Sequence, residues 1–370
     1  MRRVLHLVGA SEDNGGILSV IRGIASHGPA TGWGHVAWMR EGFRQEREPR
    51  LEVRESAFAI GESPSHLRML ASAILAYPGL SRLVRREGFD VVHGHSRGAL
   101  PLTWWLARSG FPVLFTNHAY ARRKGMYRRA AKGRGMVTVL LTPNQARHYG
   151  IEPRAGVVEV VSAHGADRFF EAPLRGGGWG GEGTLRLIGV GNVVRWKAWD
   201  LLVDAISRLP SGLRGRVKAT IWGPVPDEPD AREFAAEVEA LVKARGLEGN
   251  VRLAGPTRDV QAALGQADLF VLPSTNEPCS VALIEAMAMG LPALVSASGG
   301  NVDIVRDGET GLMFKPGLVE GLAGALERVL RGEARLATPA GVRASVRMRC
   351  AREVSARYSE IYARLAAGRR

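Results

Sequence analysis

The sequence predicts an α/β protein of two domains in series, each built on a doubly wound parallel sheet. Short apolar runs rich in β-branched residues alternate with longer helical patterns from end to end, as in right-handed βαβ units. This alternation starts again after Phe170. The 370 residues, of which 45% are hydrophobic and 23% charged, are enough for two packed cores and exclude a minimal binding module.

The first domain is expected over residues 1–168. Its strand candidates are short apolar runs at 4–8, 35–39, 91–93, 113–116, 137–141 and 157–161. Helical patterns separate them, for example over 17–26 and 97–108. The run at 4–8 is too short for a secretion signal and is soon followed by a polar segment, so we expect a first strand there.

The second domain is expected over residues 169–351. Its strand candidates are the runs at 185–190, 218–222, 251–254, 269–272 and 293–296. The glycine-rich segment 175–183 has little side chain to pack, which predicts a surface loop at the domain junction. The tail over 352–370 alternates apolar and basic residues at helical spacing, and we expect a helix there that packs back on the first domain.

Composition limits the classes of function. The chain has only two cysteines, Cys279 and Cys350, which excludes a disulfide scaffold and favours a reducing, cytoplasmic compartment. No stretch approaches the roughly 20 apolar residues that cross a bilayer, so any membrane contact is expected to be peripheral.

Positive charge is concentrated in the first half of the chain. The net charge is +14, and residues 1–170 carry 24 Lys/Arg against 13 Asp/Glu. Segment 122–134 has seven cations and no acid, with Met126 and Tyr127 among them as candidate shallow membrane anchors. Two interpretations stay open: a solvated helix face, or a surface for an anionic partner such as phospholipid or nucleic acid.

Ligands of doubly wound sheets bind beyond the carboxyl ends of the strands, so the loops after strands are candidate sites. After the first strand, Gly15 and Gly16 precede a helix. Bare backbone at a helix N-terminus can approach an anion, although paired glycines also occur in plain turns.

The strongest signal follows the run at 269–272. A polar loop with Asn276 and Glu277 leads into a helix near 279–281, whose first-turn N–H groups could bind phosphate. Glu285 lies in an otherwise apolar part of this helix, where a carboxylate without a partner is costly. A solvated surface residue would not explain that position, so we expect Glu285 to bind a ligand.

Glu277 and Glu285, followed by Ala-Met-Ala-Met-Gly-Leu-Pro, resemble the paired-glutamate motif of family four of the retaining, nucleotide-sugar-dependent glycosyltransferases. Segments 298–301 and 307–312 belong to the same resemblance, which extends over nearly the whole chain. It implies the GT-B fold, with two Rossmann-like domains facing a central cleft. It also implies transfer of a hexose from a nucleoside-diphosphate sugar to an acceptor hydroxyl, with retention of anomeric configuration.

The resemblance implies roles for individual residues. Glu285 would bind the ribose and Glu277 hydroxyls of the donor sugar, while backbone amides at the helix start would meet the pyrophosphate. The implied donor-binding residues are Gly15, Gly16, Arg195, Lys197, Asn276, Cys279, Ser280, Val281 and Glu285. The implied catalytic residues are Glu277, His118 and Lys197.

Two segments depart from the family pattern. Within 189–198 the family has an arginine and, five residues later, a lysine on the diphosphate. Lys197 matches the lysine, Asn192 stands at the arginine position, and Arg195 could substitute only if the loop turns it inward. His164 replaces an asparagine of the hinge segment 162–167, where we expect a structural role.

Histidines follow two strands on the side expected for the acceptor. His118 matches a family histidine beside the donor sugar. His93 and His95 are expected to line the acceptor side together with Arg122 and Arg123. The sequence contains no HExxH and no DxD, and a basic pyrophosphate site would not need magnesium, so we expect neither a metal nor a cofactor.

The expected donor is an NDP-sugar, with UDP favoured over GDP. The expected acceptor is a glycan or a lipid-linked molecule of cell-surface polysaccharide or glycolipid synthesis. An anionic cytoplasmic membrane surface is a further expected partner, and nucleic acid is not expected. Alternatives are a nucleotide-sugar epimerase or phosphorylase of the same fold, or a non-catalytic basic protein that binds lipid or nucleic acid. An NAD-dependent oxidoreductase is disfavoured because no GxGxxG follows the first strand.

Overall fold

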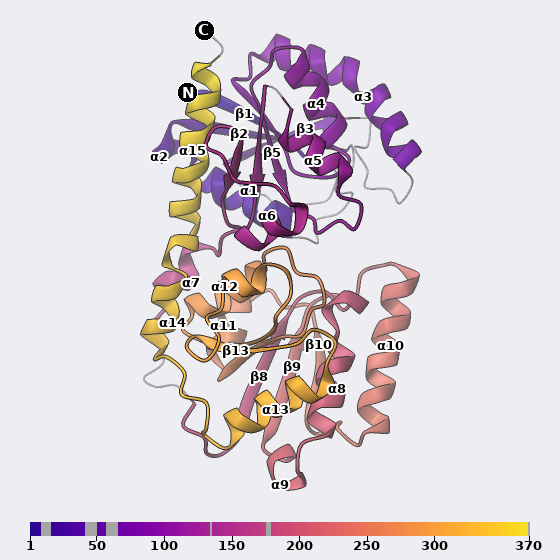
Figure 1. Cartoon of the computed structure of the whole chain (residues 1–370), viewed down its shortest axis with the longest axis vertical. Helices are drawn as coiled ribbons and strands as arrows, with labels where there is room; N and C mark the ends of the chain where they lie inside the picture. The colour runs from indigo at the N-terminus through magenta and orange to yellow at the C-terminus, as the bar shows by residue number, and fades with distance from the viewer. Residues whose placement is uncertain (9–15, 41–49, 57–65, 134, 175–178, 369–370) are drawn as a thin grey trace. The chain divides into compact units, whose positions relative to one another are not determined.

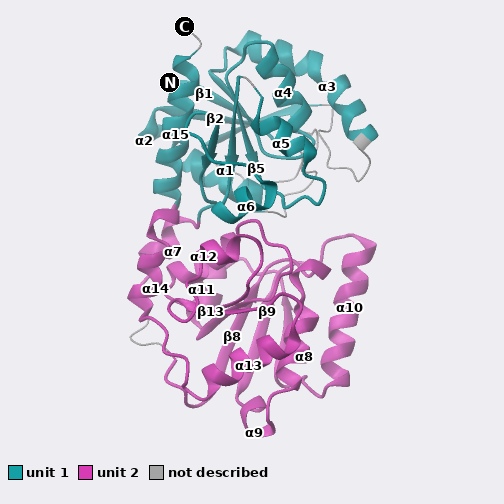
Figure 2. Cartoon of the chain, in the orientation of Figure 1, with its two compact units in different colours: residues 1–164, 351–370 teal, residues 165–350 magenta. Residues whose placement is uncertain are grey.

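The computed structural model describes residues 1–8, 16–40, 50–56, 66–133, 135–174 and 179–368. They form two compact units, Met1–His164 with Ala351–Arg370, and Gly165–Cys350 (Figure 2). The chain therefore changes unit at 164/165 and at 350/351, whereas the sequence analysis placed these boundaries at 168/169 and 351/352. Gly15 lies outside the described residues.

Unit 1 is built on a parallel sheet with the strand order β3-β2-β1-β4-β5-β6-β7. Its strands are β1 (Arg2–Leu7), β2 (Trp33–Arg40), β3 (Leu51–Ser56), β4 (Val91–Gly94), β5 (Val113–Asn117), β6 (Met136–Leu140) and β7 (Val158–Val160). Because neighbouring residues of a strand point to opposite faces, Leu5 and Leu7 enter one core while His6 enters the other.

Helices cover both faces of this sheet (Figure 1). Unit 1 contains α1 (Gly16–Ser26), α2 (Gly28–Thr31), α3 (His66–Glu87), α4 (Leu100–Arg108), α5 (Gly125–Ala131), α6 (Pro143–Tyr149) and α15 (Ala351–Ala367). The helices α3 and α4 pack on the face of Leu5 and Leu7, while α1, α2 and α15 contact one another beside the other face.

The C-terminal helix α15 is joined to unit 1 by polar contacts as well as by packing. Arg357 and Arg364 both pair with the buried Glu159 of β7, at 3.0 and 2.7 Å. The hydroxyl of Ser355 donates to the carbonyl oxygen of Ile24 on α1 at 3.2 Å. Although α15 follows unit 2 in the sequence, it covers a face of the unit 1 sheet.

Unit 2 is built on a second parallel sheet, with the order β10-β9-β8-β11-β12-β13. Its strands are β8 (Leu185–Val190), β9 (Val217–Trp222), β10 (Val251–Gly255), β11 (Leu269–Leu272), β12 (Ala293–Ser296) and β13 (Gly311–Phe314). All apolar runs named in the sequence analysis lie in strands of one sheet or the other, which confirms the α/β class with two parallel sheets.

The helices of unit 2 are α7 (Asp167–Glu171), α8 (Trp199–Ser207), α9 (Ser211–Arg214), α10 (Pro229–Ala244), α11 (Val260–Gly265), α12 (Val281–Ala288), α13 (Val319–Leu330) and α14 (Pro339–Ser345), with 3-10 turns η1 (Arg195–Lys197), η2 (Gly299–Asp303) and η3 (Arg347–Arg349). The glycine-rich segment predicted as a surface loop at the domain junction does not lie at the boundary between the units; its residues 175–178 lie outside the described part, and Gly180, Glu182 and Gly183 are exposed. Trp179 packs against the unit 2 core and donates to the carbonyl oxygen of Val329 at 3.3 Å, so this part of the segment lies within unit 2.

Candidate functional site

The loop between β11 and α12 lies at the carboxyl edge of the unit 2 sheet, where doubly wound folds bind ligands. The helix begins at Val281, and Ser280 caps it by accepting the N–H of Leu283 on its hydroxyl oxygen at 3.2 Å. The first-turn amides of a helix have no partner within the helix. The predicted phosphate-binding residues Cys279, Ser280 and Val281 therefore stand at a capped helix N-terminus.

Two predicted site residues from distant parts of the sequence meet in unit 2. The ammonium of Lys197 lies 2.6 Å from Oε2 of Glu277, and both side chains are less than 10% exposed. The hydroxyl of Ser274 also donates to Oε2 at 3.3 Å. The ammonium of Lys197 further lies over the ring of Trp196, 4.5 Å from its centroid. The structure thus brings a cation and a carboxylate together in a desolvated position.

The backbone around Lys197 accounts for the direction of its side chain. Ala198, which follows it, has a φ of 54° and is the single non-glycine residue with positive φ in the described part of the chain. This left-handed conformation ends η1 and begins α8. Gly191 leaves room for the lysine, because a Cβ there would lie 3.1 Å from Cε of Lys197.

The glycine pair of segment 298–301 lets the loop of Glu277 pack closely. Gly299 has a φ of 54°, and a Cβ on it would lie 2.1 Å from the carbonyl oxygen of Glu277. The N–H of Gly300 donates to that oxygen at 2.7 Å. The hydroxyls of Ser296 and Ser298 both donate to the carbonyl oxygen of Ser274. These contacts fix the backbone of the loop, and the sequence analysis did not anticipate the serines.

Glu285 lies on α12 within the same unit and is held by few polar contacts. Its Oε1 accepts the N–H of Ala166 at 3.4 Å, and a Cβ on Gly165 would lie 3.0 Å from its Cγ. Burial raises the pKa of Glu285 to about 7, against the opposing effects of the Ala166 N–H and of Arg168. Because few protein groups offset the charge of this carboxylate, its oxygens can accept hydrogen bonds from hydroxyl groups of a ligand.

Arg195 does not lie where a substitute for the missing diphosphate arginine would be expected. Its guanidinium pairs with Asp230 at 2.8 Å and with Glu237 at 2.7 Å, both on α10, and it covers the ring of Phe234. Because α10 supplies these carboxylates, the loop turns Arg195 toward that helix. Lys197 is therefore the better candidate for the diphosphate.

The remaining donor-side predictions differ in outcome. Gly16 is the first residue of α1 and is exposed, and Asn276 is exposed in the loop before Glu277. His164 is buried in unit 1, where its Nε2 lies 3.0 Å from the carbonyl oxygen of Val20. A Cβ on Gly23 of α1 would lie 2.0 Å from the His164 ring, so this histidine packs tightly on α1.

The histidines of the predicted acceptor side are placed differently from expectation. His93 is 0% exposed and His95 is 1% exposed, so neither can contact an acceptor, and that prediction is wrong. His93 lies 2.7 Å from the hydroxyl of Tyr362 and 2.7 Å from that of Thr116. His118, directly after β5, is half-buried, and its Nε2 lies 3.2 Å from Nδ1 of His95.

The basic segment surrounds α5. Arg122 and Arg123 are exposed just before this helix, and Arg128 donates to the carbonyl oxygen of Tyr149 at 2.6 Å. Between residues 91 and 151 the sequence contains no Asp or Glu at all. Tyr127 is 3% exposed and packs against Tyr149, so the prediction that it is a shallow membrane anchor is wrong.

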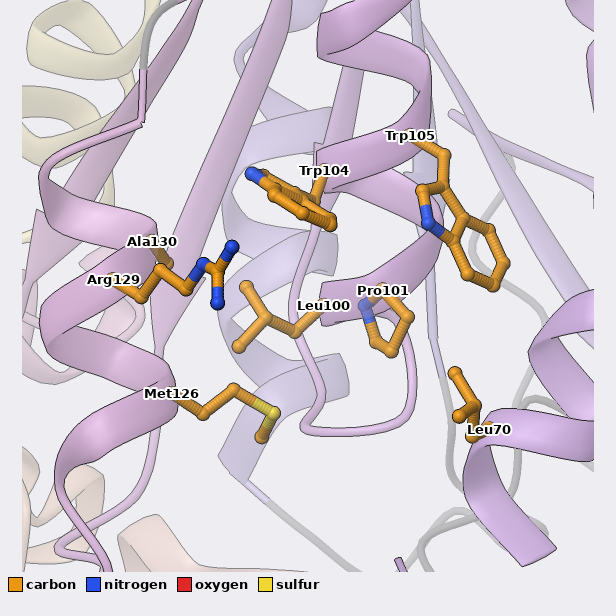
Figure 3. Close-up of a pocket in the computed structure, with 8 residues that line it drawn as sticks. All are labelled: Leu70, Leu100, Pro101, Trp104, Trp105, Met126, Arg129 and Ala130. Atoms are coloured by element: carbon orange, nitrogen blue, oxygen red, sulfur yellow. The ribbon is translucent and has the colours of Figure 1, made fainter. Parts of the chain in front are cut away.

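Beside α5 lies an apolar pocket of about 250 Å³ (Figure 3). Its lining residues come from α3, α4 and α5: Leu70, Leu100, Pro101, Trp104, Trp105, Met126, Arg129 and Ala130. The guanidinium of Arg129 lies over the ring of Trp104, 5.2 Å from its centroid. On α3 the nearby Leu67, Ile74 and Leu75 are each more than half exposed. Among the described helices, none combines the length and the apolar character needed to span a bilayer.

Solved structures place this architecture in the GT-B class. Sucrose-phosphate synthase from Thermosynechococcus elongatus matches with a TM-score of 0.80 at 18% identity, over 100% of both chains. HepE from Anabaena, solved in complex with UDP and glucose, matches with a TM-score of 0.71 at 15% identity, over 97% of this chain and 99% of the other. At such identities the likeness establishes the fold.

Sequence families give the more particular assignment. The model described as glycosyl transferases group 1 matches residues 181–343, and the glycosyl transferase 4-like domain matches residues 15–170. Both models describe glycosyl transferases, and the chain belongs to this family. The lipopolysaccharide core biosynthesis glycosyltransferase LpsE of Rhizobium meliloti is 31% identical over 39% of this chain and 39% of its own length. The chain spans less than two thirds of the length of the first curated relatives it matches.

Proposed function

We propose that the protein is a retaining hexosyltransferase that uses a nucleoside-diphosphate sugar, with UDP as the favoured nucleotide. The buried pair of Lys197 and Glu277 beside the capped start of α12 carries this proposal. Glu285 on the same helix supplies a carboxylate for the ribose. The complex of HepE with UDP and glucose is consistent with UDP as the nucleotide.

In the proposed reaction the glycosidic bond to the diphosphate breaks while negative charge grows on the leaving group. Lys197 and the first-turn amides of α12 stabilise that charge, because both are positive and already oriented. Glu277 accepts hydroxyls of the sugar through Oε1, since Oε2 is held by Lys197 and Ser274. The carboxylate then orients the sugar and does not act as a nucleophile.

Retention follows if the acceptor hydroxyl attacks from the side of the leaving diphosphate, with a phosphate oxygen taking its proton. His118 contacts the donor sugar in this proposal. Since Lys197 and α12 already compensate the diphosphate, the reaction needs no divalent metal. Turnover should therefore be unchanged in EDTA, and restoration of lost turnover by Mg²⁺ or Mn²⁺ would contradict this part of the proposal.

The acceptor is proposed to be a glycan or lipid-linked glycan of cell-surface polysaccharide or glycolipid synthesis, presented at an anionic cytoplasmic membrane. The acid-free stretch 91–151 and the exposed Arg122 and Arg123 support attraction to an anionic surface. The apolar pocket beside α5 and the exposed leucines of α3 offer shallow apolar contact in the same unit.

Nucleotide binding tests the donor site directly. Glu285→Ala should weaken the binding of UDP by about 1 to 3 kcal/mol, the cost of losing a charge-assisted hydrogen bond. Calorimetry with UDP measures this, and Glu309→Ala, an exposed acid elsewhere in unit 2, is the matched control. Equal UDP affinity of Glu285→Ala and wild type would refute the ribose assignment. In a separate assay, hydrolysis of UDP-sugars without transfer to any acceptor would favour a hydrolysing epimerase.

A further inference from the structure

A row of four histidines crosses the unit 1 sheet on the face covered by α15. His35 of β2, His6 of β1, His95 after β4 and His118 after β5 come from four strands that are consecutive in the sheet order. His35, His6 and His95 are buried, and His118 is the half-buried end of the row.

Each neighbouring pair in the row is joined by the same type of hydrogen bond. Nδ1 of His35 lies 2.9 Å from Nε2 of His6, and Nδ1 of His6 lies 2.9 Å from Nε2 of His95. Nδ1 of His95 lies 3.2 Å from Nε2 of His118. Every link therefore joins an Nδ1 to an Nε2.

A neutral imidazole carries one N–H and one lone pair, so this pattern allows only two proton arrangements. Either every Nδ1 donates toward His118, or every Nε2 donates toward His35. The rings are neutral at pH 7 because burial, the largest cause, lowers the pKa of each of the four. The tautomers of all four histidines are thus coupled.

The end of the row at His35 decides between the two arrangements. Nε2 of His35 is buried and has no hydrogen-bond partner among the described residues. If the row donated toward His35, this atom would be a buried N–H without an acceptor, which native proteins rarely contain. If the row donates toward His118, the same atom is a lone pair, whose burial is tolerated more often.

We propose that His95, whose Nε2 is occupied by the row of His6 and His35, is a positioning residue that fixes His118 as the tautomer with its proton on Nδ1. His118 then offers an N–H donor at Nδ1 and keeps Nε2 occupied by His95. A histidine held in this way donates a hydrogen bond to the donor sugar and does not act as a general base. The catalytic part of this inference rests on the proposed function, whereas the tautomer does not.

Histidine-selective ¹⁵N labelling of the full chain tests the tautomer without any substrate. Long-range ¹H–¹⁵N spectra at pH 7.5 should show His118 protonated at Nδ1 and unprotonated at Nε2, with His95→Asn and His118→Asn used for assignment. In His95→Phe the donor to Nε2 of His118 is lost, and His118 should shift toward a mixture of tautomers. A wild-type His118 with its proton on Nε2 would overturn the proposal.

A matched control separates this effect from general damage to the layer. Tyr362→Phe removes the hydroxyl bonded to His93 in the same buried layer and leaves the row untouched. Tyr362→Phe should keep the wild-type His118 signals. If this variant also lost the Nδ1 proton of His118, the tautomer would not depend specifically on the row, and the proposal would be overturned. If His95→Phe does not fold, His95→Asn serves in its place. His35→Phe leaves Nε2 of His6 as the buried end of the row, so it should keep the wild-type tautomer, and a shift there would overturn the direction inferred from this end.

Turnover provides the second measurement, with UDP-glucose as the probe. His95→Phe should lower kcat by roughly tenfold, as for other residues that orient a catalytic group, while KM changes less than twofold. An unchanged kcat together with an altered tautomer would overturn the positioning role. If wild type has no activity on any UDP-sugar, the proposed function fails while the tautomer result still stands.

The row also has to be distinguished from a metal site. Ring nitrogens of His6, His93 and His95 lie within 4.8 Å of one another. Both nitrogens of His93 already lie 2.7 Å from hydroxyl groups, and no carboxylate belongs to the group to offset a buried dication. The hydrogen-bonded row would be refuted in favour of a metal site if the purified protein contained stoichiometric zinc and the His118 signals changed when EDTA removed it.

Discussion

At the residue scale, the proposed contact of Glu285 with the ribose would couple UDP binding to the ionisation of one partly buried carboxyl. Its pKa of about 7 means that much of the free protein carries this group protonated at pH 6. The carboxylate is the form that accepts two ribose hydroxyls. We therefore expect UDP to bind more tightly as the pH rises from 5.5 to 8, by up to about tenfold per pH unit below the pKa. In Glu285→Gln this part of the pH dependence should vanish in calorimetry, and its persistence would assign it to another group.

The same raised pKa predicts a stability effect. An acid whose folded-state pKa lies above its unfolded value of 4.5 binds more protons when folded, so stability falls as the pH rises from 4.5 to about 7. Glu285→Gln should therefore stabilise the ligand-free protein at pH 8, by about 1 to 3 kcal/mol, and have little effect below pH 4.5. Thermal melts at both pH values measure the difference, and equal shifts at the two values would contradict the assignment.

Lys197 and Glu277 are expected to depend on each other. Lys197→Met leaves a buried carboxylate without its cation, which typically costs about 3 to 5 kcal/mol, or roughly 6 to 20 °C in melting temperature. Combining it with Glu277→Gln should recover most of that loss, because no buried charge then remains unpaired. Scanning calorimetry of the unit 2 transition compares the single and the double variant. Turnover should not recover, since in the proposed reaction Lys197 stabilises the leaving diphosphate, and one such preorganised donor typically contributes about 10² or more to the rate.

At the element scale, α15 completes unit 1 although unit 2 precedes it in the chain. A chain ending at Cys350 would lack the partner of His93 at Tyr362 and both arginines that pair with Glu159. We expect such a truncation to abolish cooperative unfolding of unit 1, while unit 2 keeps its own transition and its affinity for UDP. Hydrogen exchange of the two units measures this outcome, and protected strands β1 and β4 in the truncated chain would contradict it.

The elements also show how far the sequence alone reaches. Strands buried on both faces, such as β1 and β11, are continuous apolar runs and could be predicted. The strand β3 was missed because Glu52, Arg54 and Glu55 give it the composition of a loop, and it lies at the edge of the sheet. The strand β13 was missed because its four residues begin with a glycine and include no β-branched residue, unlike β11 and β12 of the same length.

For the site, the sequence identified residues better than their contacts. Glu277 and Lys197 were named separately, but nothing in a spacing of 80 residues predicts that their side chains meet. Arg195 could point to either side of its loop, and only the acids of α10 decide its direction. The histidine row depends on the register of four strands, so it could not be predicted from histidines that are isolated along the chain.

At the scale of the whole molecule, positive charge is concentrated in the first half of the chain, so we expect the proposed anionic membrane surface to contact unit 1. Wild type should co-sediment with anionic vesicles, not with neutral ones, and salt should release it, because each exposed cation near such a surface contributes about 1 kcal/mol. Replacing Arg122, Arg123 and Lys124 with Gln should abolish vesicle binding while UDP affinity stays unchanged. These three are preferable to Arg128 and Arg129, which bond Tyr149 and cover Trp104.

The control for the vesicle experiment removes equal charge from unit 2, by replacing Arg258, Arg328 and Arg335 with Gln. It should bind vesicles like wild type, since those arginines are exposed outside the acid-free stretch. Equal binding by both triple variants would remove the membrane proposal and leave a soluble anionic acceptor as the better explanation.

The place of α15 in the chain has a consequence during protein synthesis. The sheet face that carries His6, His35 and His93 receives part of its cover from residues 351–367, which the ribosome makes only after the whole of residues 165–350. At about 5 to 20 residues per second, unit 1 waits on the order of 10 to 40 seconds with this face open, while unit 2 is a continuous segment that can fold in the meantime. Chaperones and proteases therefore have the longest access to unit 1, whose synthesis begins first and whose final helix, α15, is made last.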